Sequence, residues 1–171
     1  DPDDSRLTEN YLMGQQVYPD GSNVLCEIGN SQGIPMNIVN VVPGVDWAEE
    51  LHGYHLAKYE YVAGMSPGAM SNDVFPFRYT DILMMKAECL LRTGQSGAGA
   101  LVTQVRQRAF KDNPELAVVT DEELKQNSSY QYGYVENYQI VDKGNTDPVQ
   151  FGRMYDELGW EFAWEMHRRR D

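Results

Sequence analysis

Residues 78–95 carry more apolar side chains than one face of a surface helix can hold. Their spacings of three and four predict a helix that starts near a cap at Thr80 or Asp81 and ends at Gly94. One apolar stripe comprises Tyr79, Leu83, Ala87, Leu90 and Leu91, and a second stripe on another side comprises Ile82, Met85 and Cys89. We therefore expect both sides of this helix to be buried.

A second helical pattern follows after a connection of only Gln95 and Ser96. A connection this short places two helices side by side and antiparallel. The partner helix can bury one stripe of the first helix, so the second stripe needs another surface. Because the chain contains no evident second copy of this hairpin, we expect that surface to lie partly outside these residues. The second helix has one apolar face, formed by Ala98, Leu101, Val102, Val105 and Ala109.

The last helical pattern begins near Val149 and places two tryptophans, Trp160 and Trp164, one turn apart. We expect both to belong to the core rather than to a ligand platform. The main apolar face comprises Phe151, Met154, Tyr155, Leu158, Phe162 and Met166.

The same helix stacks Glu157, Glu161 and Glu165 at successive intervals of four residues, where like charges repel. Guanidinium groups pair carboxylates through two parallel hydrogen bonds. We therefore predict that Glu161 or Glu165 contacts an arginine. The candidates are Arg78, Arg106, Arg108, Arg168 and Arg169.

The rest of the chain is less regular. Residues 37–42 and 55–62 favour short strands, Pro19-Asp20-Gly21 is typical of a turn, and alternating tyrosines near residue 132 favour another strand. Thr120-Asp-Glu-Glu123 is a capping box that predicts a short helix through about residue 126. The pattern predicts a mainly α protein with irregular loops and a few short strands. We divide its single domain into an extended region (1–75), a helical hairpin (76–110), an insertion (111–148) and a last helix (149–171).

Composition narrows the function classes. The 171 residues suit one domain, and 26 acidic against 14 basic residues give a net charge of −12, which disfavours nucleic acid and anionic lipid as partners. Two cysteines, Cys26 and Cys89, do not indicate a disulfide framework. The apolar runs are too short to span a bilayer.

Three segments, in this order, resemble the C-terminal part of the SusD/RagB family. The first is Phe77-Arg-Tyr-Thr-Asp-Ile-Leu-Met-Met-Lys-Ala-Glu88, and the second is Val105-Arg-Gln-Arg-Ala109. The third contains Trp160-Glu-Phe-Ala163 and His167-Arg-Arg169, with departures from the family pattern at Leu158, Met166 and Arg170. Near the start, Asp4-Ser5-Arg6-Leu7 is similar to the family's Asp-Pro-Arg-Leu stretch.

The resemblance implies helical hairpins of tetratricopeptide type and a chain that is part of a longer protein, whose missing half covers the second stripe. It also implies an outer-membrane lipoprotein, anchored at the cell surface through an N-terminal part absent from these residues. Members of the family capture oligosaccharides, or in some cases peptides, for import by a TonB-dependent transporter. No catalysis, cofactor or metal is implied.

Glycan binding directs attention to aromatic residues, since their planes pack against the C–H faces of sugar rings. The candidate ligand-binding residues are Trp47, Tyr54, Tyr132, Tyr134 and Tyr138. Core packing or cross-strand pairing is the alternative explanation for each. The Arg and Glu residues of the matched segments are expected to hold helix to helix, with an acidic-sugar clamp as the alternative.

Two other functions fit parts of the sequence. His52 and His55, near Glu49 and Glu50, could ligate zinc in a hydrolase, but Gly53 interrupts the helix that usually presents such a pair. A helical-repeat scaffold that binds another protein would share the predicted hairpin. We prefer the glycan-binding interpretation because it accounts for all three matched segments.

Overall fold

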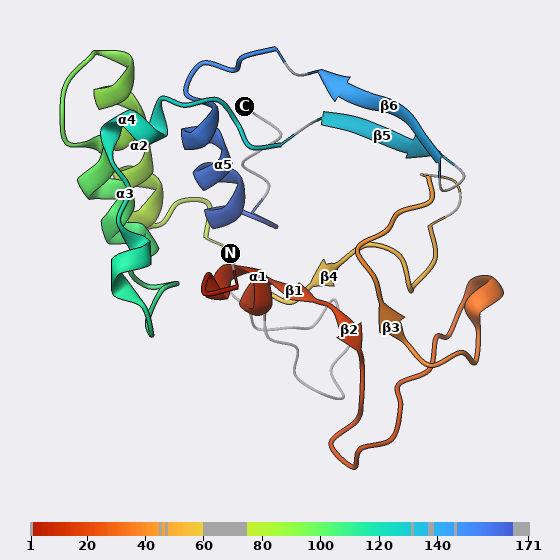
Figure 1. Cartoon of the computed structure of the whole chain (residues 1–171). Helices are drawn as coiled ribbons and strands as arrows, with labels where there is room; N and C mark the ends of the chain where they lie inside the picture. Colours follow the sequence, from red (N-terminus) through yellow and green to blue (C-terminus); the bar gives the residue numbers. More distant parts are fainter. Residues whose placement is uncertain are drawn as a thin grey trace. The chain divides into compact units, whose positions relative to one another are not determined.

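The computed structural model describes residues 2–44, 46, 48–59, 75–130, 132–136, 139–145 and 147–165. The chain divides into two compact units, each discontinuous in sequence (Figure 1). The helical unit comprises Asp1–Leu7, Tyr59–Tyr130 and Asp147–Asp171, and the strand unit comprises Thr8–Lys58 and Gln131–Thr146. The short helix α1 (Ser5–Asn10) begins in the first unit and ends in the second. The predicted mainly α class is confirmed, whereas the predicted single domain stays a prediction.

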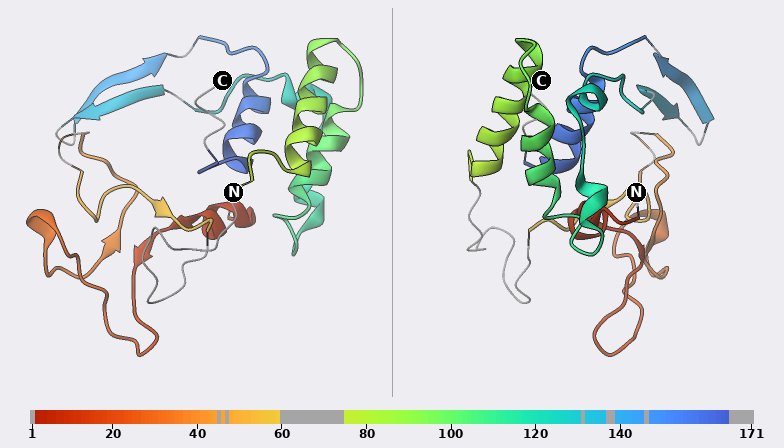
Figure 2. Two further views of the ribbon diagram at one scale, coloured as in Figure 1. Left: turned by 180° about the vertical axis from the view of Figure 1, so that it is seen from behind. Right: turned by 60° about the vertical axis from the view of Figure 1, so that its left-hand side comes forward.

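The helical unit is built on the predicted hairpin. Helix α2 (Tyr79–Arg92) and helix α3 (Ala98–Arg106) lie side by side and antiparallel in all the views (Figures 1 and 2). Gly94 has a φ of 69°, the left-handed conformation that glycine adopts without a steric penalty. The Gly94 amide donates to the Leu91 carbonyl oxygen, which closes the last turn of α2.

Helix α2 starts slightly earlier than predicted, at Tyr79. Asp81 therefore occupies the third helical position instead of the cap. From there its carboxylate accepts a 2.8 Å hydrogen bond from the backbone N–H of Arg78. This is the reciprocal half of a capping box, so Asp81 still satisfies a backbone donor at the start of the helix.

The two stripes of α2 have different outcomes. On the first stripe Leu83, Ala87 and Leu91 are buried as expected, but Tyr79 is 70% exposed. Met84, which neither stripe included, is also buried. On the second stripe Ile82 is 53% exposed and Met85 45% exposed, and Cys89 is also exposed. This chain therefore leaves the second stripe uncovered, and the expectation that a surface partly outside these residues covers it stays a prediction. Successive helical side chains are about 100° apart, so an arc centred on Met84 and Ala87 turns Ile82, Met85 and Cys89 away.

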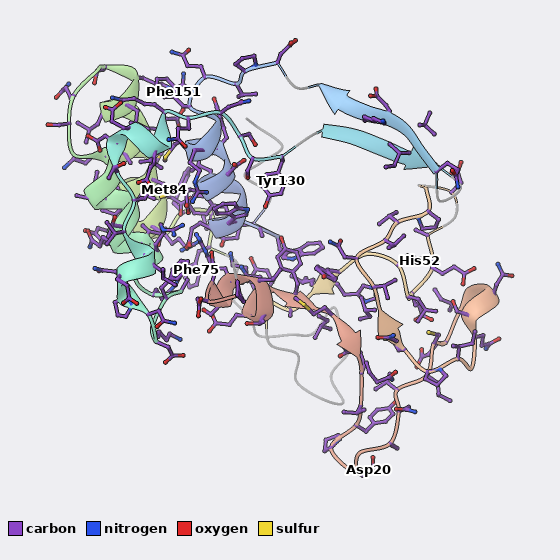
Figure 3. All side chains as sticks on the ribbon, in the orientation of Figure 1. Asp20, His52, Phe75, Met84, Tyr130 and Phe151 are labelled. Atoms are coloured by element: carbon purple, nitrogen blue, oxygen red, sulfur yellow. The ribbon has the colours of Figure 1, made fainter. Side chains whose placement is uncertain are left out.

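The core of the helical unit joins α2 and α3 to the segments that follow. Figure 3 labels Met84 on α2 and Phe151 at the start of the last helix, and both belong to this core. Leu124 comes from the short helix α4 (Asp121–Leu124). The buried residues are Leu83, Met84, Ala87, Leu91, Ala98, Val102, Val105, Val119, Leu124, Phe151, Met154 and Phe162.

Two glycines allow close backbone contacts in this unit. A Cβ atom on Gly99 of α3 would lie 2.9 Å from the Asp121 backbone nitrogen. A Cβ atom on Gly152 would lie 2.7 Å from the carbonyl carbon of Asn127. Gly152 begins the last helix, α5 (Gly152–Glu161), so any larger residue would push this helix away from the 127–128 backbone.

Helix boundaries differ from the predictions after residue 110. The capping box at Thr120 forms, because the Glu123 backbone amide donates to the Thr120 hydroxyl oxygen over 3.2 Å, but α4 ends at Leu124 instead of residue 126. A 3-10 helix, η4 (Pro114–Ala117), was not predicted. Helix α5 ends at Glu161, so Phe162 lies at its C-cap. Phe151, Met154 and Phe162 are buried as predicted, while Met166 lies outside the described residues.

Among its described residues, the strand unit has three small antiparallel strand pairs. Strand β1 (Tyr11–Leu12) pairs with β4 (His55–Leu56), and β2 (Gly14–Gln15) pairs with β3 (Asn37–Ile38). Strand β5 (Tyr132–Glu136) pairs with β6 (Gln139–Asn145), with Glu136 opposite Gln139. The short 3-10 helix η1 (Gly29–Ser31) lies between β2 and β3. The strands predicted at 37–42 and 55–62 therefore form only at their first two residues, and residues 60–62 lie outside the described part.

Candidate functional site

The predicted ligand-binding aromatics have different outcomes. Tyr54 is half-buried, and its ring lies 6.2 Å from the ring of Tyr11 at an interplanar angle of 56°. The β1–β4 pairing explains this contact, because Tyr11 lies opposite Leu56, and Tyr54 is two residues before Leu56 on the same face. The two rings are tilted relative to each other, and each remains partly exposed to solvent.

The other four predicted residues are less fully described. Tyr132 and Tyr134 lie on β5, opposite Asn145 and Asp142 respectively, with a register irregularity between them. Trp47 and Tyr138 lie outside the described residues. Their role in ligand binding stays a prediction.

The histidine pair does not form a metal site with other described residues. The Nδ1 atom of His52 accepts a 3.0 Å hydrogen bond from the backbone N–H of Glu49, so this nitrogen is used in a local turn. His55 is on β4, where it pairs with Leu12. In the described ranges, no cluster of His, Cys, Asp and Glu side chains could hold a metal ion. The hydrolase alternative gains no support.

Arginines hold Glu161, at the end of α5, and Glu165, which follows the helix, as predicted. Both oxygens of Glu165 accept 2.9 Å hydrogen bonds from Arg78, through Nε and Nη2. Arg78 also lies 2.9 Å from Glu161, and Arg108 donates to Glu161 over 2.6 Å. Glu161 is 1% exposed. Its burial requires these cations, because an unpaired buried carboxylate would be strongly destabilising.

Glu157 lies at the centre of the same cluster and is fully buried. Arg106 donates to one of its oxygens, Arg153 approaches the same oxygen at 2.8 Å, and Arg6 donates to the other over 3.2 Å. Arg106 was among the predicted cations. Arg6 was missed, because it lies 151 positions from Glu157 in the sequence. Arg153 could have been found, because it lies four residues before Glu157.

Two guanidinium groups in this cluster respond differently to their surroundings. Burial lowers the pKa of Arg106, and the neighbouring charges of Arg6 and Arg153 act in the same direction. Burial also opposes ionisation of Arg6, but its hydrogen bond to Asp4 and the charge of Glu157 outweigh it, so the pKa of Arg6 is raised. Both remain charged, because an arginine in a protein does not lose its proton. The carboxylates of this cluster face arginines and are buried, which favours the structural interpretation over an acidic-sugar clamp.

The tryptophans of the α5 region do not both belong to the core. Trp160 is half-buried: its indole N–H donates to the Tyr130 hydroxyl over 2.7 Å, and the Arg153 guanidinium lies 4.4 Å from its ring centroid. Trp164 is 43% exposed, with a φ of 68°. The expected burial of Trp164 is wrong because α5 ends at Glu161, so helical spacing does not extend to it.

An open depression of about 460 Å³ in the strand unit was not predicted. Its lining combines an aromatic ring, two amides and a carboxylate, which are the groups that bind sugars. Sequence neighbours could not reveal it, because Tyr18 and Gln32 line the same depression only after the chain has folded back. The lining residues are Tyr18, Asn23, Leu25, Cys26, Glu27, Gln32 and Gly33.

Comparison with known families decides the relationship. The sequence model described as the SusD family matches residues 2–171. The chain belongs to the SusD family. SusD-family membership associates it in general with glycan binding in nutrient uptake, and the family's proteins are generally non-enzymatic.

Two further comparisons add no relative. Neither a curated protein nor a solved structure matches the chain. Within the described ranges, each helix is too short or too polar to cross a membrane. SusD-family proteins are typically lipoproteins associated with the outer membrane, so their attachment depends on a lipid.

Proposed function

We propose that this protein binds oligosaccharides at the cell surface and delivers them to a TonB-dependent transporter, without changing them chemically. The match of the SusD family model to residues 2–171 carries the proposal. The lipid anchor and the outer-membrane location belong to the same proposal. A peptide is the alternative ligand.

The described side chains are consistent with binding instead of catalysis. The most strongly clustered charged groups, around Glu157 and Glu161, are buried and pair with each other. A general acid or base must reach the proton that it transfers, and these carboxylates are closed to a ligand. The strand unit, in contrast, presents tyrosines and amides on its surface. We propose that Trp47, Tyr54, Tyr132, Tyr134 and Tyr138 contribute to ligand contact.

The direct test is binding of the purified protein to a panel of oligosaccharides and peptides, measured by isothermal titration calorimetry. We expect saturable binding of at least one oligosaccharide and no release of shortened products during prolonged incubation. Copurification of a transporter from solubilised outer membranes tests the partner. Absence of binding across the panel, or cleavage of the bound glycan, would contradict the proposal.

A protein-interaction scaffold is the second candidate. The exposed side of α2, with Ile82 at 53% and Met85 at 45% exposure, favours it because single surface helices rarely present such a stripe. The same side could instead be covered by another part of a longer SusD-family protein. Replacing both residues with glutamine separates the two functions, because glycan binding should persist while any protein contact made through this side is lost.

A further inference from the structure

The open depression in the strand unit is formed by residues 18–33. Its floor and walls come from three extended segments. Val17 bridges to Asn23, and Leu25 bridges to Pro35. The backbone N–H of Cys26 donates to the Ile34 carbonyl oxygen over 2.9 Å, and Gly33 donates back to Cys26 over 2.9 Å. The lining is therefore fixed by backbone hydrogen bonds on both sides.

Tyr18 is positioned by a tight hairpin. Its carbonyl oxygen accepts from Gly21 over 2.9 Å, and its backbone N–H donates to Ser22 over 2.8 Å. Pro19 follows Tyr18, and Gly21 has a φ of 84°, which matches a three-residue hairpin loop with its last residue in the left-handed region. Asp20 lies at the tip of this loop (Figure 3) and accepts from the Ser22 backbone over 2.9 Å. The loop therefore holds Tyr18 at the edge of the depression.

The far side of the depression is also held in place. Backbone N–H groups of Glu27 and Ile28 donate to one carboxylate oxygen of Glu50, over 2.7 and 3.0 Å. The Glu49 carboxylate accepts from the Asn30 amide over 2.9 Å and from the Ser31 hydroxyl. A loop that is anchored in this way loses less conformational freedom when a ligand binds.

The lining has the chemistry of a sugar site. The Tyr18 side chain is 52% exposed, so its ring is available to stack on the C–H face of a pyranose. Asn23, Glu27 and Gln32 are exposed around it. Sugar hydroxyls both donate and accept hydrogen bonds, and amides offer both functions in fixed geometry. Neither the Asn23 nor the Gln32 side-chain amide forms a hydrogen bond to another residue that the structure describes.

The charge around the depression restricts the ligand. Between Arg6 and Lys58 the sequence has no Lys or Arg. A uronate or sulfate on a bound sugar would therefore meet carboxylates without a neighbouring cation in this segment, and repulsion would weaken binding. An uncharged sugar ring is not repelled in this way. The acidic residues of this segment are Glu9, Asp20, Glu27, Asp46, Glu49 and Glu50.

We propose that the depression lined by Tyr18, Asn23, Glu27 and Gln32 is a subsite for a neutral pyranose unit of the bound oligosaccharide. The proposal rests on the proposed function and specifies where and what the protein binds. Tyr18 provides the stacking plane, the amides of Asn23 and Gln32 bind hydroxyls as donors and acceptors, and Glu27 accepts from hydroxyls. Acidic glycans are excluded by charge.

The test uses affinity electrophoresis and calorimetry with neutral polysaccharides (glucans, xylan and mannan), acidic ones (polygalacturonate and alginate) and a Lys-rich peptide. The Tyr18→Ala variant should weaken binding of the neutral ligand by about tenfold or more, whereas Tyr18→Phe, which keeps the ring, should stay within about threefold. Asn23→Ala and Gln32→Ala should each weaken it by about threefold or more. Tyr79→Ala is the matched control, since Tyr79 is 70% exposed on α2 in the other unit.

The outcomes separate the two proposals. If the unmodified protein binds a neutral glycan but Tyr18→Ala and Gln32→Ala bind it equally well, the subsite is wrong and the proposed function stands. If only an acidic glycan or the Lys-rich peptide binds, neutral selectivity is wrong. If the unmodified protein binds no ligand of the panel, the proposed function fails together with the subsite. Circular dichroism of each variant establishes that lost binding does not reflect unfolding, and the exposed Gln32 gives a second variant if Tyr18→Ala does not fold.

Discussion

The helical unit and the strand unit are held together in different ways. The helical unit buries a continuous apolar core and, next to it, the carboxylates of Glu157 and Glu161 with their arginines. In the strand unit, the buried hydrophobic side chains among the described residues are few, including Cys26 and Ile38. Short strand pairs and turns provide most of its fixed contacts.

In the function that we propose, the helical unit is the stable framework and the strand unit carries the binding surface. Buried side chains fix the helices, so little of their chemistry is left for a ligand. Backbone hydrogen bonds fix the strand unit instead, and this leaves side chains such as Tyr18 and Gln32 on the surface. Binding residues are often found on loops for this reason.

The largest expected effect comes from the buried charge cluster. Replacing Glu157 with alanine leaves Arg106 buried without a carboxylate partner among the described residues and removes one of the carboxylates around Arg6, so we expect the free energy of unfolding to fall by about 3–5 kcal/mol. Urea denaturation followed by circular dichroism measures it. Glu88→Ala is the control: Glu88 pairs with Arg92 on the surface, at 2.6 Å, and its loss should cost about 0.3–0.5 kcal/mol. Equal effects of the two variants would contradict the account of the cluster.

The two adjacent methionines of α2 provide the next test. Met84 is 1% exposed and Met85 is 45% exposed, although the sequence pattern placed Met85 in an apolar stripe and Met84 in neither stripe. We expect Met84→Ala to lower the free energy of unfolding by about 2–5 kcal/mol through the cavity that it creates. Met85→Ala should change it by less than about 0.5 kcal/mol. Thermal and urea denaturation of both variants would disagree with the described burial if Met85 proved the more sensitive.

A smaller effect is expected at the hairpin of the strand unit. Gly21 has a φ of 84°, and its substitution with alanine should destabilise the loop by about 1 kcal/mol because of the left-handed backbone. Amide hydrogen exchange at Tyr18 and Val24 reports on this hairpin, because these amides donate to Ser22 and Gln16 across it. We expect faster exchange at these amides and unchanged exchange within α2. Unchanged exchange at Val24 would show that the loop does not hold the pair together.

The smallest effect is expected at Asp121, which caps α3 from outside the helix. Its carboxylate accepts from the backbone N–H groups of Gly97, at 2.9 Å, and Gly99, and these bonds lower its pKa below the ordinary value of 3.8. This stability is present above pH 3.8 and is lost as the pH falls through the lowered value. Asp121→Ala should cost about 0.5–1 kcal/mol at neutral pH. The difference from the unmodified protein should shrink in acid.

Measuring the free energy of unfolding at several pH values shows whether Asp121 stabilises the protein through its charge or through its packing. Glu122→Ala is the control, because Glu122 is the next residue and is an exposed partner of Lys125. It should change the free energy of unfolding by a few tenths of a kcal/mol. A constant effect of Asp121→Ala from neutral pH to about pH 3 would argue against the cap.

Much of the helical unit could be predicted from local pattern. The spacing of Leu83, Ala87 and Leu91, the stop at Gly94 and the capping box at Thr120 all act within a few residues, so they can be read along the sequence. The arginine partners of Glu161 and Glu165 were predicted by a different argument, because stacked carboxylates need cations.

Features that depend on long-range contacts could not be predicted. Met84 and Met85 lie on either side of the boundary of the buried arc, which the core shared with several later segments sets. Arg6 reaches Glu157 across almost the whole chain. The lining of the depression at Tyr18 comes from separate stretches of the chain that the backbone pairings bring together. Sequence pattern favoured other aromatics because they are clustered along the chain.

The most direct test of glycan binding by the strand unit is a nuclear magnetic resonance titration of the isotope-labelled protein with a neutral oligosaccharide that it binds. We predict chemical-shift changes concentrated at residues 18–33, including the side-chain amides of Asn23 and Gln32, with resonances of α2 and α3 unchanged. Saturable shifts confined to the helices, with residues 18–33 unaffected, would contradict the account.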